Sequence, residues 1–118
     1  MINFENSFHK LNNNFYENVT PSKPPKPELI SFNKSLSKLL GIKKSWIESI
    51  EGLECFTGKN VIKNSNPLAM VYAGHQFGNW VPRLGDGRAI LLGEILDQNN
   101  KRWDIQLKGS GITPFSRN

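Results

Sequence analysis

The clearest hydrophobic pattern in the chain is a pair of segments close to its end. Residues 89–96 form an almost continuous apolar run, and residues 97–100 form a polar cluster typical of a turn. Residues 101–108 then alternate, which in a strand divides the side chains between two faces. One face carries Trp103, Ile105 and Leu107, and the other carries Arg102, Asp104, Gln106 and Lys108. This pattern predicts an antiparallel β-hairpin.

Helical spacing and end signals predict two helices in the middle of the chain. Ser31 is a candidate N-cap for a helix through Leu40, which Gly41 would end. Ser45 and Glu48 have the spacing of a capping box that opens a second helix. The apolar residues near one face of this second helix, which we expect in the core, are Trp46, Ile47, Ile50 and Leu53.

A third helix is predicted from residue 67 onward. Asn66 stands directly before Pro67, as an N-cap stands before a proline at the first helical position. The helix would run to Gly78 and would include Met70, Val71, His75 and Phe77.

The first thirty residues predict an arm rather than a domain of their own. Residues 6–18 carry aromatic side chains at roughly helical spacing, which predicts a short helix or an anchored arm. Prolines at positions 21, 24, 25 and 27 then predict an extended segment. Such a segment could serve as a polyproline ligand for a partner, but we favour an arm that wraps around the same protein.

Composition indicates one soluble globular domain. The 118 residues are 37% hydrophobic and 21% charged, and 15 Lys and Arg against 10 Asp and Glu give a net charge of +5. The charges are spread along the chain, which favours a solvated basic surface over a nucleic-acid site. Trp46, Trp80 and Trp103 are not interleaved with Lys and Arg as in a base-stacking platform, so we expect no nucleic-acid partner.

Other composition signals exclude further classes. No apolar segment reaches membrane length, and residues 1–10 do not read as a secretory signal, so we expect no membrane partner. Cys55 is the only cysteine, which excludes an internal disulfide and fits a reducing compartment, the cytoplasm. His9 and His75 have no cysteine or carboxylate at ligand spacing, so we interpret both as structural.

The candidate chemistry lies in a glycine-rich loop and a strand lysine. Gly85 and Gly87 flank Asp86, so the backbone can adopt positive φ and bring its N–H groups close to a ligand. Arg88 follows, and a guanidinium suits phosphate oxygens. Lys108 ends the alternating strand on its polar face and supplies a second positive charge. The same pattern is typical of an ordinary hairpin turn and a solvated sheet face, so both interpretations stand.

Longer stretches of sequence carry a resemblance to a known family. They are residues 72–78 (YAGHQFG), 84–89 (LGDGRA), 91–94 (LLGE), 104–111 (DIQLKGSG) and 113–117 (TPFSR). In this order the stretches closely resemble the selenoprotein O family of protein adenylyltransferases. The resemblance begins at residues 4–8 and covers almost the whole chain.

The resemblance implies a fold and a set of site residues. It implies an α+β chain, a partial protein-kinase-like N-lobe, with an N-terminal helical or extended arm (residues 1–65). Residues 66–118 would begin the nucleotide-binding lobe, with the hairpin that carries the glycine-rich loop and the lysine. ATP would contact Gly85, Gly87 and Arg88, and Lys108 would correspond to the phosphate-binding lysine of kinase strand β3.

The resemblance also implies a reaction. Family members bind ATP in an orientation that is flipped relative to ordinary kinases, and with Mg²⁺ or Mn²⁺ they transfer AMP to Ser, Thr or Tyr of protein substrates. Their second Gly-Asp-Gly-Arg stretch, catalytic aspartate and metal ligands have no counterpart in these 118 residues. We therefore assign no catalytic and no metal-binding residue, and we expect an N-terminal fragment that is inactive alone. The alternatives are a non-catalytic ATP-binding or interaction fragment of a split or degraded gene and, less favoured, a basic nucleic-acid-binding domain.

Overall fold

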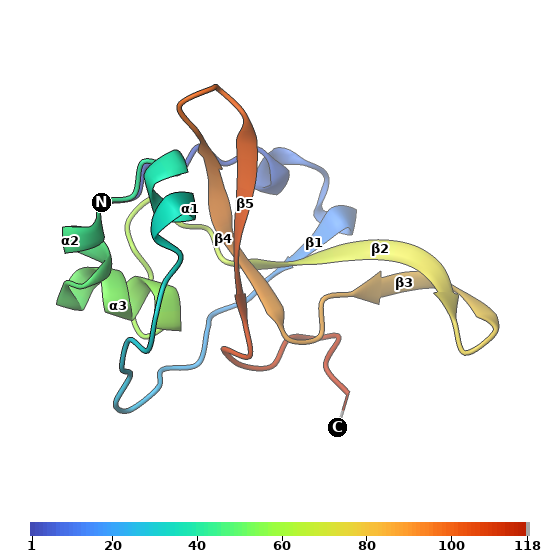
Figure 1. The fold of residues 1–118 in the computed structure, drawn as a ribbon. Coiled ribbons are helices and arrows are strands. Elements are labelled where there is room, and N and C mark those ends of the chain that lie inside the picture. Colours follow the sequence, from blue (N-terminus) through green and yellow to red (C-terminus); the bar gives the residue numbers. More distant parts are fainter. Residues whose placement is uncertain (118) are drawn as a thin grey trace.

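The structure is a computed structural model that describes residues 1–117, and it combines an antiparallel sheet with three short helices (Figure 1). The helical elements are η1 (Phe8–Lys10), η2 (Asn13–Phe15), α1 (Lys34–Leu39), α2 (Lys44–Ile47) and α3 (Ile50–Thr57). The strands are β1 (Tyr16–Asn18), β2 (Leu68–Gln76), β3 (Asn79–Gly85), β4 (Ala89–Leu96) and β5 (Arg102–Lys108). An α+β class with an antiparallel sheet is therefore confirmed.

Strand β2 links two parts of the sheet. Its first residues pair with β1 and, at Leu68, with Leu91 of β4, whereas residues 71–76 pair with β3. Strand β4 pairs in turn with β5, and all of these pairings are antiparallel. The β2–β3 hairpin consequently projects away from the helices, as Figure 1 shows on the right. The body and this projecting hairpin give principal extents of 46 × 35 × 25 Å.

The predicted helix from residue 67 to Gly78 is wrong, because this segment is strand β2 and the turn that follows it. Asn66 does not cap a helix; its N–H donates to the carbonyl of Leu92 at 3.3 Å. Phe77 and Gly78 both have positive φ, 53° and 77°, which turns the chain tightly into β3. Pairing of β2 with three other strands outweighs the local capping signal.

The predicted β4–β5 hairpin is confirmed, with strands at Ala89–Leu96 and Arg102–Lys108. Asp97 organises the turn, because its Oδ1 accepts hydrogen bonds from the N–H groups of Asn99 at 2.7 Å and Lys101 at 2.9 Å. Its Oδ2 accepts from the indole N–H of Trp103 at 2.9 Å. This last hydrogen bond, with that from Lys101, holds the pKa of Asp97 below its ordinary value.

The two middle helices form with different ends than predicted. Helix α1 begins at Lys34, where Oδ1 of Asn33 accepts from the N–H of Leu36 at 2.9 Å, so Ser31 is not the cap. The chain then turns at Gly41, whose φ is 72°.

The Ser45–Glu48 capping box is also wrong. Lys43 precedes helix α2, and Ser49 caps a separate helix α3 by accepting from the N–H of Gly52 at 3.1 Å. The break between the helices leaves Trp46 and Ile47 buried, as predicted. Ile50 was expected in the core but is 79% exposed, because it begins the separate helix α3 and does not continue the apolar face of α2.

The hydrophobic core lies between the helices and the β4–β5 hairpin. Its buried members are Ile2, Ile42, Trp46, Ile47, Cys55, Leu92, Ile95 and Leu107. Burial, together with the nearby charge of Glu51, raises the pKa of the Cys55 thiol to about 11, so this thiol is protonated at neutral pH.

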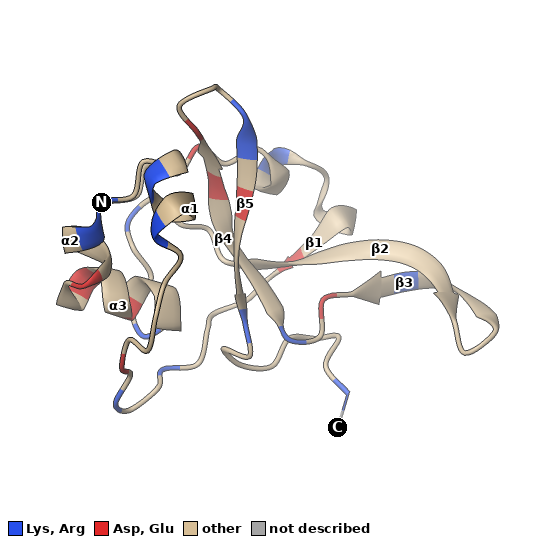
Figure 2. Cartoon of the chain, viewed as in Figure 1, with Lys and Arg blue, Asp and Glu red and all other residues tan. Residues whose placement is uncertain are grey.

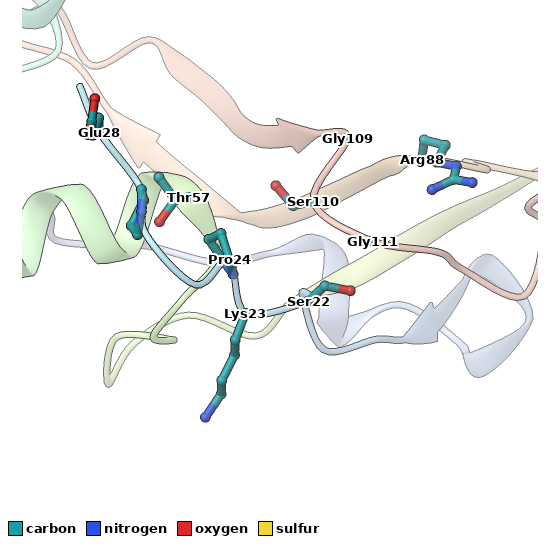
Figure 3. Close-up of a pocket in the computed structure, with 10 residues that line it drawn as sticks. Ser22, Lys23, Pro24, Glu28, Thr57, Arg88, Gly109, Ser110 and Gly111 are labelled. Carbon is teal, nitrogen blue, oxygen red and sulfur yellow. The ribbon is translucent and has the colours of Figure 1, made fainter. Parts of the chain in front are cut away.

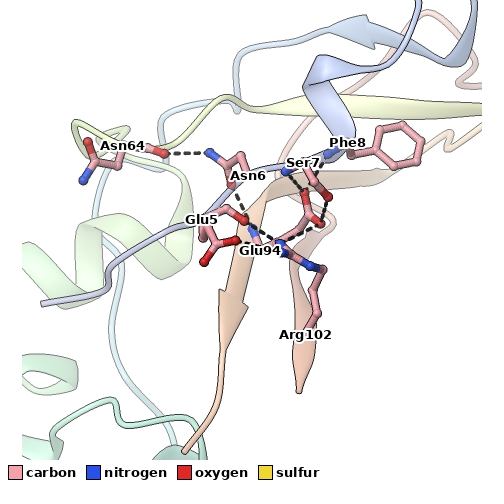
Figure 4. A network of polar contacts seen from close by, with 7 residues as sticks. All are labelled: Glu5, Asn6, Ser7, Phe8, Asn64, Glu94 and Arg102. Atoms are coloured by element: carbon pink, nitrogen blue, oxygen red, sulfur yellow. Dashed lines mark hydrogen bonds and ion pairs between the residues drawn. The ribbon is translucent and has the colours of Figure 1, made fainter. Parts of the chain in front are cut away.

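The N-terminal arm is anchored by one buried carboxylate (Figure 4). Oε2 of Glu94 accepts from the N–H groups of Ser7 at 2.6 Å and Phe8 at 2.8 Å, and Oε1 accepts from the Ser7 hydroxyl at 2.6 Å. Arg102 donates to the Glu5 carboxylate at 2.8 Å and to Oε1 of Glu94 at 3.4 Å. The prediction of an anchored arm over residues 6–18 is thus confirmed, with two 3₁₀ turns in it.

These contacts decide the ionisation of the Glu94 carboxyl. Burial alone would raise its pKa, but the hydrogen bonds from Ser7 and Phe8 and the charge of Arg102 outweigh burial. The pKa of Glu94 therefore lies below its ordinary value. Asp104 pairs with Glu94 across the hairpin, and its pKa is raised by burial and by the negative charge of Glu94.

Candidate phosphate-binding site

The glycine-rich loop connects two separate hairpins. Strand β3 ends at Gly85 and β4 begins at Ala89, but β3 pairs with β2 and not with β4. The N–H of Asp86 donates to the carbonyl of Met70 at 3.1 Å, which ties the loop to β2. The loop is therefore a crossing between strands rather than an ordinary hairpin turn.

The glycines of the loop serve close packing, and the expectation of positive φ at these positions is wrong. The glycines with positive φ lie at positions 41, 58, 78, 109 and 111. A Cβ on Gly85 would lie 2.3 Å from Cδ2 of Phe115, and a Cβ on Gly87 would lie 3.3 Å from the Phe115 carbonyl oxygen. Gly85 thus permits an approach of the Phe115 ring that no larger residue allows.

The structure brings Lys108 next to the loop. Lys108 is the partner of Ala89 in the β4–β5 ladder, and the N–H of the following Gly109 donates to the carbonyl of Arg88 at 2.9 Å. Both cationic side chains are exposed, and within residues 1–117 neither forms an ion pair. The two residues are therefore close along the backbone, and each side chain offers a positive charge that suits the oxygens of an anion.

A cleft of about 640 Å³ opens between the β2–β3 hairpin and the segment that follows β5. It is lined by Tyr72, Gln76, Val81, Arg83, Leu84, Gly85, Gly87, Arg88, Phe115 and Arg117. The charged residues in this lining are all arginines. The guanidinium of Arg83 lies 5.6 Å from the centre of the Phe115 ring and pairs with Glu17, and that of Arg117 lies 4.9 Å from the Phe77 ring.

A second cleft of about 570 Å³ lies on the other side of Arg88, against the proline-rich arm (Figure 3). Its lining includes Lys23, Glu28, Thr57 and Ser110. The Glu28 carboxylate makes this cleft less suited to a phosphate than the cleft with three arginines. Lys108 is not among the lining residues of either cleft.

The sequence patterns did not assign a role to several residues of the first cleft. Arg83, Arg117 and Phe115 reach it from β3 and from the end of the described chain. The position of Arg83 could have indicated a role in the cleft, because this arginine stands only two residues before the glycine-rich loop. His75, interpreted as structural, packs edge to face on Trp80 with ring centres 5.3 Å apart.

Positive charge also gathers at helices α1 and α2, where one pocket is lined by Lys34, Lys38, Lys43 and Lys44. Figure 2 shows Lys and Arg distributed over the arm, the helices and the strands, with Asp and Glu among them. Within residues 1–117 no three His, Cys, Asp or Glu side chains gather where they could hold a metal ion. No helix in this part of the chain is long and apolar enough to cross a membrane.

Comparisons with known proteins show the family of the chain. The family model described as "Protein adenylyltransferase SelO" matches residues 1–118. The chain belongs to the SelO protein adenylyltransferase family. The match confirms the family resemblance that the stretches around the glycine-rich loop indicated.

Curated relatives carry the name "Protein nucleotidyltransferase YdiU". Those of Bradyrhizobium sp. (strain BTAi1) and Rhodopseudomonas palustris (strain BisB18) are each 53% identical over 114 residues. That of Alkalilimnicola ehrlichii is 48% identical over the same length. Each alignment covers 97% of this chain and 23% of the relative. The chain therefore spans about a quarter of the length of these relatives.

Proposed function

We propose that the 85–88 loop and Lys108 bind the phosphates of ATP in a protein adenylyltransferase. The observation that carries the proposal is the β4–β5 pairing of Lys108 with Ala89 and the hydrogen bond from the Gly109 N–H to the Arg88 carbonyl, which bring the backbone at Lys108 close to the loop. Gly85 and Gly87 supply backbone that a ligand can approach, and Arg88 and Lys108 supply charge. Gly85, Gly87 and Arg88 also line the arginine-rich cleft, so this part of the loop is open to a ligand.

At the level of the fold, we propose that residues 66–118 are the start of a kinase-like nucleotide-binding lobe, preceded by an arm and helices over residues 1–65. An antiparallel sheet with a lysine at the end of β5 supports this assignment. The lysine of protein kinases also stands on a strand of an antiparallel sheet and contacts phosphates. The proposed setting is the cytoplasm, where the lone buried thiol of Cys55 stays reduced.

The proposed reaction of the full-length family is AMP transfer to a protein. A Ser, Thr or Tyr hydroxyl oxygen attacks the α-phosphorus, the bond to the β-phosphate oxygen breaks, and pyrophosphate leaves. Fixed cations and N–H donors offset the charge that develops on the phosphate oxygens. The proposed role of Arg88 and Lys108 is to hold the phosphates in line for this attack.

A divalent metal does not fit the residues described. No three suitable side chains gather within residues 1–117, and Asp86 is the only carboxylate in the loop. The hydroxyl proton likewise needs a base that we do not assign here. We therefore propose that the isolated chain binds ATP but does not transfer AMP.

Binding is tested by NMR titration of the 118-residue chain with ATP. We expect a dissociation constant on the order of a millimolar, because the phosphates meet only two cations and one loop. Lys108→Ala and Arg88→Ala should each remove most of the binding. Lys101→Ala, an exposed lysine at the other end of the same hairpin, is the matched control and should leave it unchanged. Equal affinity in the two site variants and the wild type would contradict the proposal.

Transfer is tested with labelled ATP, Mg²⁺ or Mn²⁺, and added protein. We expect no AMP on the chain or on the added protein. Robust transfer that Lys108→Ala abolishes would show that the chain is an enzyme by itself and would overturn the second half of the proposal.

A further inference from the structure

The segment after β5 forms a turn at residues 113–116 whose two hydroxyl side chains face the glycine-rich loop. The N–H of Thr113 donates to Oγ of Ser116 at 2.9 Å, and the N–H of Phe115 donates to Oγ1 of Thr113 at 3.2 Å. Each hydroxyl oxygen thus already accepts a hydrogen bond from within the turn. Each hydroxyl proton is therefore free to be donated outward.

Both protons are donated to carbonyls of the loop. Oγ1 of Thr113 donates to the carbonyl of Asp86 and lies 3.1 Å from that of Gly87, and Oγ of Ser116 donates to the carbonyl of Gly87. Thr113 is buried, with 7% of its surface exposed. The two carbonyls are thus held by side chains more than twenty residues away, across a water-poor contact.

Holding these carbonyls fixes the opposite side of the loop. In a trans peptide the C=O and the following N–H point in opposite directions, and the described chain has no cis peptide. The N–H groups of Gly87 and Arg88 are therefore turned away from the 113–116 turn. Within residues 1–117 neither donates a hydrogen bond to another group.

The Phe115 ring packs directly against the glycine-rich loop. It occupies the space where a Cβ on Gly85 would lie, so the loop and the turn are in direct contact. Two consecutive N–H groups on the same side of the loop, backed by fixed carbonyls, can both donate to one anion.

We propose that Thr113 and Ser116 are positioning residues that orient the N–H groups of Gly87 and Arg88 toward a phosphate of the bound nucleotide. This inference deepens the proposed function and rests on it, since the loop must receive a phosphate for its orientation to matter. The hydroxyls themselves do not touch the phosphate. They act through the peptide planes of residues 86–88.

The test uses NMR titrations of the 118-residue chain with two probes, ATP and tripolyphosphate. Thr113→Val and Ser116→Ala remove each hydroxyl, and Thr113→Ser and Ser116→Thr are matched controls that keep it. We expect the first pair to shift the Gly87 and Arg88 amide signals of the free chain and to weaken binding of both probes at least about fivefold, as loss of one hydrogen bond implies. The control pair should stay within about twofold of the wild type.

The outcomes separate this inference from the proposed function. Unchanged affinity for both probes in Thr113→Val and Ser116→Ala would overturn the inference and leave ATP binding intact. Hydroxyl-dependent binding of tripolyphosphate without ATP binding would support the orienting role of Thr113 and Ser116 toward a phosphate, but it would contradict the proposed function and the nucleotide as the source of that phosphate. Binding of neither probe by the wild type would overturn both. If the NMR spectrum of Thr113→Val loses the dispersed amide signals of the β4–β5 hairpin, that variant is unfolded. The affinities of Ser116→Ala then decide whether the inference holds.

Discussion

The two hairpins of this protein differ sharply in how they are held. Six of the eight residues of β4 are buried, whereas none of the seven residues of β3 is. The β4–β5 hairpin packs against the helices and the N-terminal arm, and the β2–β3 hairpin exposes Tyr72, Phe77 and Trp80. The glycine-rich loop joins the two, so only its β4 end enters a buried strand. The 113–116 turn holds the loop at the point where packing stops.

The largest effect is expected in the packed hairpin. Leu91 is 2% exposed, and Leu91→Ala should lower the free energy of unfolding by roughly 2–5 kcal/mol through lost burial and a cavity. That is a large part of the whole stability of a small domain. Urea denaturation measures it, and Tyr72→Ala on the projecting hairpin is the comparison. Similar losses at both positions would mean that the two hairpins are equally well packed.

Glu94→Gln should destabilise the anchored arm by roughly 1–3 kcal/mol. The charge that strengthens the hydrogen bonds from the Ser7 and Phe8 N–H groups is lost, and the amide NH2 would replace an oxygen that accepts from the Ser7 hydroxyl and Arg102. The effect should depend on pH. The folded pKa of Glu94 is lowered, so its contribution is complete above the unfolded value of about 4.3 and disappears as pH falls through the folded pKa.

Urea denaturation of this variant from pH 7 down to pH 3 checks both points. Glu28→Gln, an exposed carboxylate on the arm, is the control and should cost little at any pH. A cost of Glu94→Gln that stayed constant down to pH 3 would contradict the role given to the ionised carboxylate.

Gly85→Ala should cost about 1–3 kcal/mol, because its Cβ would overlap the Phe115 ring. In a Phe115→Ala background the same substitution should cost little, since the overlapping atoms are gone. Gly74→Ala, whose Cβ would lie 3.7 Å from Leu84, is the control on the same hairpin. Unfolding free energies of the wild type, the two single variants and the double variant complete the cycle. An equal cost of Gly85→Ala in both backgrounds would mean that the Phe115 ring is not the cause.

The smallest effect on stability is expected at the projecting hairpin. Trp80 is 61% exposed, so Trp80→Ser should change the free energy of unfolding by less than about 0.5 kcal/mol. It should nevertheless reduce self-association, because it removes part of an exposed aromatic surface. Thermal unfolding and light scattering measure the two quantities, and a large loss of stability with unchanged scattering would mean that Trp80 packs in the core.

Local patterns predicted the packed hairpin well. Alternation at residues 101–108 and the turn at Asp97 defined β4 and β5, because both signals lie within a few residues of one another. The same period put Lys108 on the polar face beside the loop. The segment at residues 67–78 was predicted wrongly, since its Asn-Pro signal is local whereas its pairing with β1, β3 and β4 is not.

The contacts that shape the loop were beyond such patterns. Thr113 and Ser116 lie 26 to 29 residues from the carbonyls they hold, and no spacing rule connects them. The glycines were recognised but given the wrong reason, because the approach of Phe115 to Gly85 depends on the tertiary structure. The residue types of the loop thus indicated a phosphate site, whereas contacts with residues far along the chain determine the shape of the loop.

The anchoring of the arm on Glu94 has a consequence for the order of folding during synthesis. Ser7 is synthesised before its partner Glu94, which lies 87 positions later in the chain. At usual elongation rates this means a delay of roughly 4–17 s before the two can meet. The segment around Ser7 therefore stays without its partner until Glu94 has been made, and it binds to the β4–β5 hairpin only after that hairpin is available.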